Sequence, residues 1–324
     1  MSPNRAAVSF TRAAAHAGDR LLDEILAGLT AQPKFLYPKF FYDERGSILF
    51  DAICELPEYY LTRTETAILS ERAPSFMRAL GPGLRLIEPG SGSSAKTRIL
   101  LDAMQTPASY VCVDISRSHL MAAAQALTAR YPQVEILPVC ADFTQPFEIP
   151  EGTTPAQSRL VFFPGSTIGN FDRDEAVALL AMMRDLAGMD GRLLVGADLR
   201  KSPRILEAAY NDAAGVTASF NLNLLARLNH EFGADFDLDA FVHRAPWVEE
   251  QSRIEMHLVS TRRQTVHIGG TEIGFEDGES IWTESCHKYD RVQFSALARE
   301  AGLDVIDVWT DREERFSVQL LATI

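Results

Sequence analysis

Short apolar runs alternate with helix-like intervals through the middle of the chain, and this alternation constrains the fold more than any other feature. The sequence predicts strands near residues 84–88, 109–114, 134–139, 158–164 and 192–198. Helical spacing of apolar residues precedes the first strand and separates most of the others, over residues 62–79, 96–105, 116–130 and 172–187. Strands that alternate with helices lie parallel in one sheet and are joined by crossover helices. The predicted fold class is therefore α/β.

The rhythm changes after residue 200. Residues 207–232 have a helical pattern, and residues 253–280 look like β-hairpin material with Gly269-Gly270 as a turn. A helix over 290–301 then leads to two closing strands, "VIDVWTD" and "FSVQLLATI". The polar turn between them is too short for a crossover helix, so these strands are expected to be antiparallel. Five alternating strands closed by such a hairpin resemble the seven-stranded, Rossmann-like sheet of class I methyltransferases, here with an insertion.

The segment "LIEPGSGSSAKT" follows the first predicted strand and opens a helix. A nucleotide-like cofactor meets a doubly wound sheet at this position. Gly90-x-Gly92-x-x-Ala95 satisfies the dinucleotide fingerprint, whereas the spacing to Lys96 is wrong for a P-loop. Glu88 decides between the remaining cofactors, because a carboxylate there repels a pyrophosphate and suits the positively charged amino group of S-adenosylmethionine (SAM).

Two further acids follow the second and third strands. Asp114 lies where an acid takes a ribose hydroxyl pair, and Asp142-Phe143 offers a carboxylate and a ring to adenine. Each acid alone is equally compatible with a helix cap or a solvent contact, but three at successive strand ends favour a sulfonium cofactor over NAD. Lys96 is grouped with this loop, although an exposed or helix-capping side chain is its simpler interpretation. We expect SAM to contact Glu88, Gly90, Ser91, Gly92, Ser94, Lys96, Asp114, Asp142 and Phe143.

The segment "PGSTIGN" follows the fourth strand, where the topology predicts a border of the substrate site. Transfer of a methyl group from a sulfonium needs alignment of an unprotonated nucleophile more than acid–base machinery. Asn170 is able to donate its amide to a carboxylate, and Gly165 leaves room beside the transferring methyl group. A glycine-rich turn with an asparagine cap is the alternative explanation of the segment.

Several longer segments are similar to one family. They are "PKFFYDERGSILFD", "LPEYYLTRTE", "IEPGSGSSAKTRILLDAM", "PGSTIGN", "AYNDAAGVTASFN", "DFDLDAF", "RIEM" and "TESCHKY". In these motifs the chain resembles the ergothioneine-pathway L-histidine Nα-methyltransferases, from about residue 20 to its end. The resemblance implies a SAM-binding domain of residues 64–199 plus 289–324, and a substrate-binding domain of residues 1–63 plus 200–288. It also implies three methyl transfers to the α-nitrogen of free L-histidine, which give hercynine in the first step of ergothioneine biosynthesis.

The same resemblance implies roles for individual residues. Tyr59, Asn170 and Tyr210 surround the substrate carboxylate as neutral donors. Tyr42 and Phe50 lie near the α-amine and its growing methyl groups, with Gly165 beside them, and aromatic faces suit an amine that ends as a quaternary ammonium. Glu284 accepts the imidazole N–H, and Met256 packs near the ring. The resemblance thus implies that Tyr42 and Gly165 are the catalytic residues. It implies substrate contacts by Tyr42, Phe50, Tyr59, Asn170, Tyr210, Met256, Glu284 and Cys286.

One position departs from the family pattern. The family has serine two residues after the glutamate, whereas this chain reads Glu284-Ser285-Cys286. Either Cys286 replaces the hydroxyl, or Ser285 supplies it from a shifted backbone. A thiol is the weaker hydrogen-bonding group, so the departure puts the affinity for histidine in question.

Alternatives and partners follow from the remaining features. Two alternatives to the methylation of histidine stay open. The enzyme methylates another amino acid, such as tyrosine or tryptophan, or the protein is a non-catalytic SAM-binding module. The net charge of -13 disfavours nucleic acid as a partner. The four cysteines lack CxxC spacing, which predicts reduced thiols and no metal site. We expect a cytoplasmic monomer without a membrane span or leader peptide, in which Tyr42 or an ordered water takes the amine proton.

Overall fold

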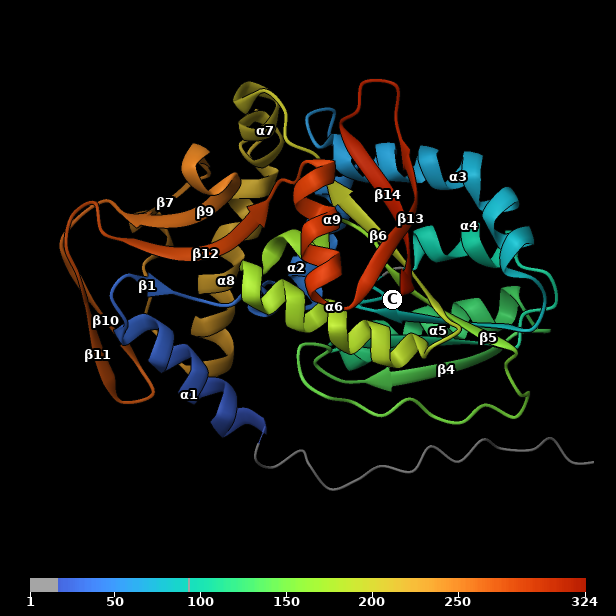
Figure 1. The fold of residues 1–324 in the computed structure, drawn as a ribbon. Helices are drawn as coiled ribbons and strands as arrows, with labels where there is room; N and C mark the ends of the chain where they lie inside the picture. The colour runs from blue at the N-terminus through green and yellow to red at the C-terminus, as the bar shows by residue number, and fades with distance from the viewer. Residues whose placement is uncertain (1–16, 93) are drawn as a thin grey trace, which may run out of the picture.

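The computed structural model describes residues 17–92 and 94–324 and contains two main β-sheets (Figure 1). The expectation about a leader peptide concerns residues that lie outside this description. The larger sheet has seven strands in the order β13-β14-β6-β5-β2-β3-β4. Five neighbouring strands, from β6 to the edge strand β4, are parallel to one another, as predicted. They are β2 (Leu84–Pro89), β3 (Ser109–Asp114), β4 (Glu135–Cys140), β5 (Ser158–Phe163) and β6 (Arg192–Asp198).

The last two strands close this sheet. β13 (Leu303–Thr310) and β14 (Phe316–Thr323) are antiparallel to each other, and β14 is also antiparallel to β6. The predicted antiparallel hairpin is therefore confirmed. The helix before it, α9 (Arg291–Glu300), begins at a capping box in which Asp290 and Gln293 exchange side-chain and backbone hydrogen bonds.

Helices cover both faces of the larger sheet. Leu86 packs into a core with one set of helices, whereas its neighbour Ile87 packs into a second core with α9 and α6 (Arg173–Ala187). The first set consists of α3 (Tyr60–Leu80), α4 (Ala95–Ala103) and α5 (Arg117–Arg130). Burial on both faces explains why the parallel strands are continuous apolar runs in the sequence.

The second sheet combines the N-terminal segment with the insertion. Its main path is β1 (Lys34–Phe35), β12 (Ser280–His287), β9 (Arg253–Ser260) and β7 (Phe241–Arg244), and β8 (Trp247–Val248) pairs with β9. β1 is parallel to β12, whereas β9 is antiparallel to β12, β7 and β8. A separate hairpin of β10 (Gln264–Ile268) and β11 (Thr271–Phe275) turns at Gly269-Gly270, as predicted.

Helices of the second part pack around this sheet. They include α1 (Ala17–Thr30), α2 (Glu44–Cys54), α7 (Pro203–Tyr210) and α8 (Val216–Phe232), with short 3-10 helices η1 (Pro38–Phe41), η2 (Thr167–Asn170), η3 (Leu238–Ala240) and η4 (Glu249–Gln251) elsewhere. The prediction of one helix over residues 207–232 is wrong, because a non-helical segment separates α7 from α8. Asp212 accepts the amides of Val216 and Thr217 at 2.9 and 2.8 Å and so starts a new helix.

The two parts share one core. A single cluster of buried apolar side chains contains Phe41 and Phe220 of the second part together with Leu86 and Tyr110 of the larger sheet. The domain boundaries near residues 63, 199 and 288 stay a prediction.

Candidate active site

A cavity of about 1420 Å³ lies where the loops after β2, β3, β4 and β5 meet α2, α7, α8, β9 and β12. Parallel strands end at one edge of a sheet, so the loops that follow them gather there. The structure brings all the residues predicted from the sequence to this cavity: Tyr42, Phe50, Tyr59, Glu88, Gly90, Ser91, Gly92, Ser94, Lys96, Asp114, Asp142, Phe143, Gly165, Asn170, Tyr210, Met256, Glu284 and Cys286. Their individual roles stay predictions.

The loop after β2 presents its backbone to the cavity. Gly90 and Gly92 have positive φ angles of 73° and 48°, which glycine adopts without strain. A Cβ atom on Gly90 would lie 3.1 Å from the ring of Phe143. The hydroxyl of Ser91 is buried and has no hydrogen-bond partner among the described residues. A bare backbone turn with an unpaired buried hydroxyl fits the close approach of a polar cofactor.

Glu88 is buried at the end of β2. Its Oε2 atom accepts hydrogen bonds from the hydroxyls of Thr97 and Tyr110. Burial raises the pKa of this carboxyl to about 7, against the opposing effect of the two hydroxyls. A cation in the cavity stabilises the ionised form, so this carboxylate fits the ammonium group of SAM.

The two other acids already accept hydrogen bonds from the protein. Asp114 accepts the amides of Gly92 at 3.0 Å and Ser116 at 2.8 Å, which fixes the glycine loop against the end of β3. Asp142 accepts the amide and hydroxyl of Thr144, and its Oδ2 atom lies 3.2 Å from Nζ of Lys39. Burial opposes the ionisation of Asp142, but these partners outweigh burial and hold its pKa below the usual value.

The expectation of an exposed or capping role for Lys96 is wrong. Its ammonium forms an ion pair with Glu65, whose side chain on α3 is fully buried. The Glu65 carboxylate also accepts the amide of Gly165 at 2.9 Å. A buried carboxylate requires such partners, and Lys96 is the charged one. The pair therefore joins the glycine loop after β2 to the loop after β5.

Aromatic rings form one wall of the cavity. The ring centroid of Tyr42 lies 5.8 Å from that of Phe50 and 5.9 Å from that of Phe220, and Phe50 and Phe220 are 6.0 Å apart. Phe50 also meets Tyr59 edge to face at 6.4 Å. Burial raises the pKa of the Tyr42 phenol well above its usual value, so this hydroxyl keeps its proton.

The three predicted carboxylate donors line the cavity from three elements. Tyr59 precedes α3, Asn170 ends η2 and Tyr210 ends α7. The rings of Tyr59 and Tyr210 meet edge to face at 6.1 Å, whereas the Asn170 amide donates to Oε1 of Glu284 at 3.1 Å. An amide group carries two N–H donors, so the second hydrogen of Asn170 is available to a ligand.

The alternation of side chains along β12 shows which of Ser285 and Cys286 takes the place of the family's serine at the cavity. Glu284 and Cys286 line the cavity two residues apart, with Met256 of β9 opposite Glu284 in register. Ser285 is buried, does not line the cavity and has a hydroxyl without a hydrogen-bond partner among the described residues. Cys286 thus occupies the position at the cavity. Burial raises the pKa of Glu284 to about 7, although Lys288 and Asn170 oppose this effect.

Several cavity residues were missed from the sequence. Phe220 completes the aromatic wall, and Thr217 places a buried hydroxyl without a partner among the described residues at the same cavity. Both lie in the α8 segment, whose apolar spacing indicated only core packing. Glu65 and Lys288 lie behind the wall. The strand period of two would have grouped Lys288 with Glu284 and Cys286, since all three lie at alternate positions.

Within residues 17–92 and 94–324, no group of three or more His, Cys, Asp or Glu side chains is arranged to hold a metal ion. In the same part of the chain, no helix is both long and apolar enough to cross a membrane.

The order of the seven strands, the acid and glycine loop after β2, and the cavity at the strand ends define a SAM-dependent methyltransferase with a Rossmann-like fold. A family model described as histidine-specific methyltransferase, SAM-dependent, matches residues 21–323, and the chain belongs to this family. The family resemblance of the sequence is thereby confirmed.

Individual relatives extend over nearly the whole chain. The histidine N-alpha-methyltransferase of Mycolicibacterium smegmatis is 43% identical over 95% of this chain and 96% of the relative. The enzyme of the same name from Mycobacterium tuberculosis is 42% identical over 92% of this chain and 94% of the relative. A more distant relative, the 4-dimethylallyltryptophan N-methyltransferase of Aspergillus fumigatus, is 26% identical over 89% of both chains.

Proposed function

We propose that this enzyme transfers three methyl groups from SAM to the α-amino nitrogen of free L-histidine and so forms hercynine, the first step of ergothioneine biosynthesis. One observation supports this most directly. Hydrogen-bond donors for a carboxylate, an acceptor for an imidazole and a wall of aromatic rings line the same cavity. The two mycobacterial relatives are named for the same activity.

The proposed binding mode uses both ends of the amino acid. Tyr59, Asn170 and Tyr210 hold the carboxylate with neutral donors, so no cation stands beside the sulfonium. Glu284 accepts the imidazole N–H at the other end. An analogue without that N–H leaves the buried Glu284 carboxyl with the Asn170 amide as its hydrogen-bond donor and no partner from the substrate, which disfavours apolar side chains.

The proposed chemistry depends on alignment. SAM, when bound, supplies an electrophilic methyl group. Tyr42, Phe50 and Phe220 surround the amine with aromatic faces, which suit a nitrogen that gains methyl groups and becomes a quaternary ammonium. The raised pKa of Tyr42 disfavours its phenolate, so we propose that water rather than Tyr42 takes the amine proton between transfers. Glu88, Asp114 and Asp142 are the proposed cofactor contacts.

We also propose a cytoplasmic monomer. The four cysteines are free thiols, as is usual in a reducing compartment. Large exposed apolar side chains of the described residues include Ile48 of α2, Met189 in the turn after α6, Val292 of α9 and Ile306 of β13, so they come from separate segments of the chain. Light scattering coupled to size-exclusion chromatography tests the monomer, and a dimer mass would contradict it.

Mass spectrometry of purified protein incubated with SAM and each common amino acid in turn tests the main proposal. Successive mono-, di- and trimethylation of histidine alone is the expected result. Methylation of tyrosine or tryptophan instead would assign the enzyme to another amino acid and would question the role of Glu284. No methylation of any amino acid, together with measurable SAM binding, would favour the non-catalytic module.

A further inference from the structure

A buried lysine lies directly behind the proposed carboxylate site. The Lys288 side chain is fully buried, and Nζ lies 3.0 Å from the hydroxyl of Tyr210, 3.0 Å from Sγ of Cys286 and 3.0 Å from Oδ2 of Asp198. Lys288 does not itself line the cavity, whereas Tyr210 and Cys286 do. The lysine thus connects the end of β6 in the larger sheet to two side chains of the substrate wall.

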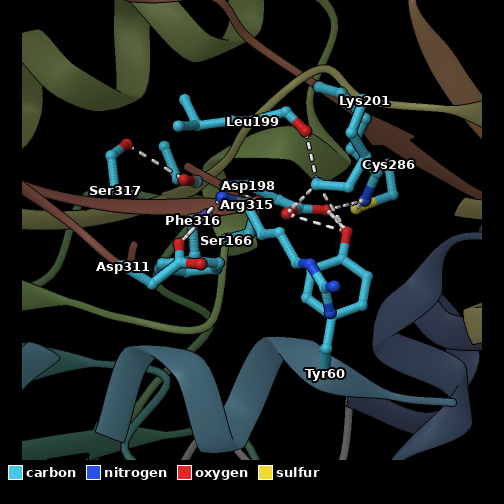
Figure 2. Close-up of polar contacts among 12 residues, drawn as sticks. Tyr60, Ser166, Asp198, Leu199, Lys201, Cys286, Asp311, Arg315, Phe316 and Ser317 are labelled. Carbon is cyan, nitrogen blue, oxygen red and sulfur yellow. Dashed lines mark hydrogen bonds and ion pairs between the residues drawn. The ribbon is translucent and has the colours of Figure 1, made fainter. Parts of the chain in front are cut away.

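Two lysines share the buried carboxylate of Asp198. Asp198 forms ion pairs with both Lys288 and Lys201. Nζ of Lys201 lies 2.7 Å from Oδ1 of Asp198 and 2.6 Å from the hydroxyl of Tyr60 (Figure 2). Two ammonium groups therefore face one carboxylate. Burial lowers the pKa of Lys201 to about 8, whereas Asp198 and Cys286 outweigh burial and raise the pKa of Lys288 above its usual value. Lys288 therefore holds its proton more firmly than Lys201 does.

The charge state of Lys288 fixes the direction of the Tyr210 hydrogen bond. An ammonium has three donors and no acceptor, so the Tyr210 oxygen must accept from Lys288. Its single proton then points away from Lys288, and Sγ of Cys286 accepts it at 2.9 Å. A thiol sulfur is a weak acceptor, and a carboxylate in the cavity competes for this proton as a charged, stronger one.

We propose that Lys288 is a positioning residue that makes the enzyme selective for substrates with a free α-carboxylate, by holding Tyr210 as a donor. This inference rests on the proposed function. Selectivity for the carboxylate then comes from a cation that never touches the substrate or the sulfonium. Because Tyr210 relays the effect, Lys288 and Tyr210 act as one unit.

The test compares two ligands that differ only at the carboxylate. Isothermal titration calorimetry of protein saturated with S-adenosylhomocysteine gives the dissociation constants of L-histidine and L-histidinamide. Their ratio measures the preference for the carboxylate. We expect Lys288→Met to reduce the ratio about tenfold. Lys288→Gln keeps a donor without the charge and should fall between this variant and the wild type.

Lys201→Met is the matched control. It also removes one of the two lysines on Asp198, but Lys201 contacts Tyr60 rather than Tyr210. Its ratio should stay within about twofold of the wild type, since a merely structural loss weakens both ligands alike. In a Tyr210→Phe background, Lys288→Gln should leave the ratio unchanged because the relay is already absent.

The outcomes separate the two proposals. An unchanged ratio of dissociation constants in both Lys288 variants would overturn the inference. An equal reduction of this ratio in Lys201→Met would also overturn it. So would a full effect of Lys288→Gln in the Tyr210→Phe background. Wild-type protein that binds no histidine would contradict the proposed function itself, and the inference would fall with it.

Discussion

The wall of the cavity after β2 is organised by a glycine turn in one short segment, whereas the substrate wall is built from side chains of distant segments. Gly90 and Gly92 turn the main chain toward the cavity within a single short segment. The substrate wall instead takes Phe50 from α2, Phe220 from α8 and Glu284 from β12, far apart in the sequence. A cofactor common to many enzymes needs one local turn, but selection of one amino acid needs side chains that only the complete fold assembles.

The largest expected effect concerns the substrate wall. Glu284→Gln removes the anionic acceptor and should lower kcat/KM for histidine by about 10- to 100-fold, while the dissociation constant of SAM stays unchanged. Steady-state kinetics and calorimetry measure the two quantities. Ser285→Ala is the control at the neighbouring position that does not line the cavity. Equal losses of SAM and histidine binding would show that the walls are not separable.

A smaller effect is expected on the cofactor wall. Glu88→Gln should weaken SAM binding by about tenfold, because a neutral amide replaces the carboxylate beside the ammonium group. Calorimetric titration with SAM gives the value. Asp102→Asn, an exposed change on α4 away from the cavity, should have no effect. Unaltered SAM affinity in the Glu88 variant would contradict the assignment of this wall to the cofactor.

The same variant has a second, pH-dependent consequence. The folded pKa of Glu88 lies near 7, above its unfolded value, so the ionised carboxyl opposes folding. The wild type should lose stability as pH rises from about 4.5 to 7, by roughly 3 kcal/mol from this group. Glu88→Gln should therefore be more stable than the wild type at pH 8 and nearly equal to it at pH 4. Urea unfolding at both pH values measures the free energy of unfolding of each protein. A difference between the two proteins that is the same at pH 4 and pH 8 would contradict the prediction.

The aromatic wall should affect the later methyl transfers most. Phe220→Leu keeps an apolar surface but removes one ring from the proposed quaternary ammonium site, which weakens the cation–π contact by about 1 kcal/mol. Dimethylhistidine should therefore accumulate about fivefold relative to the wild type, as followed by mass spectrometry over time. Phe241→Leu changes a buried ring that does not line the cavity and serves as control. A uniform slowing of all three transfers would argue for a packing effect alone.

The smallest effect is expected at the departure from the family pattern. Cys286→Ser restores the hydroxyl and should change the histidine dissociation constant by less than about threefold, because either group accepts from Lys288 and Tyr210. A much larger gain in affinity would show that the thiol limits histidine binding in this chain. Calorimetric titration with histidine distinguishes the two results.

The difference between the walls also explains what the sequence revealed. The five parallel strands, the closing hairpin and the glycine loop were predictable because each rests on local periodicity or a short motif. Asn170 and Gly165 were predicted from their place after the fourth strand, but the other substrate residues were named only through the family resemblance, since no local pattern links Tyr59 to Glu284. Phe220 and Glu65 were missed because a ring or a charge within a helical pattern does not reveal what it faces. The helix break before α8 was missed because Asp212 acts there as a cap.

The pairing of β1 with β12 has a consequence for synthesis of the chain. Lys34 of β1 pairs with Ile281 of β12, so this edge of the second sheet forms only after most of the chain has been translated. At ordinary elongation rates this delay is on the order of tens of seconds. Phe41, which is buried in the finished protein, is likewise translated long before Phe220 of α8, the ring on which it stacks. The part of the enzyme that selects the substrate is therefore completed late in the synthesis of the chain.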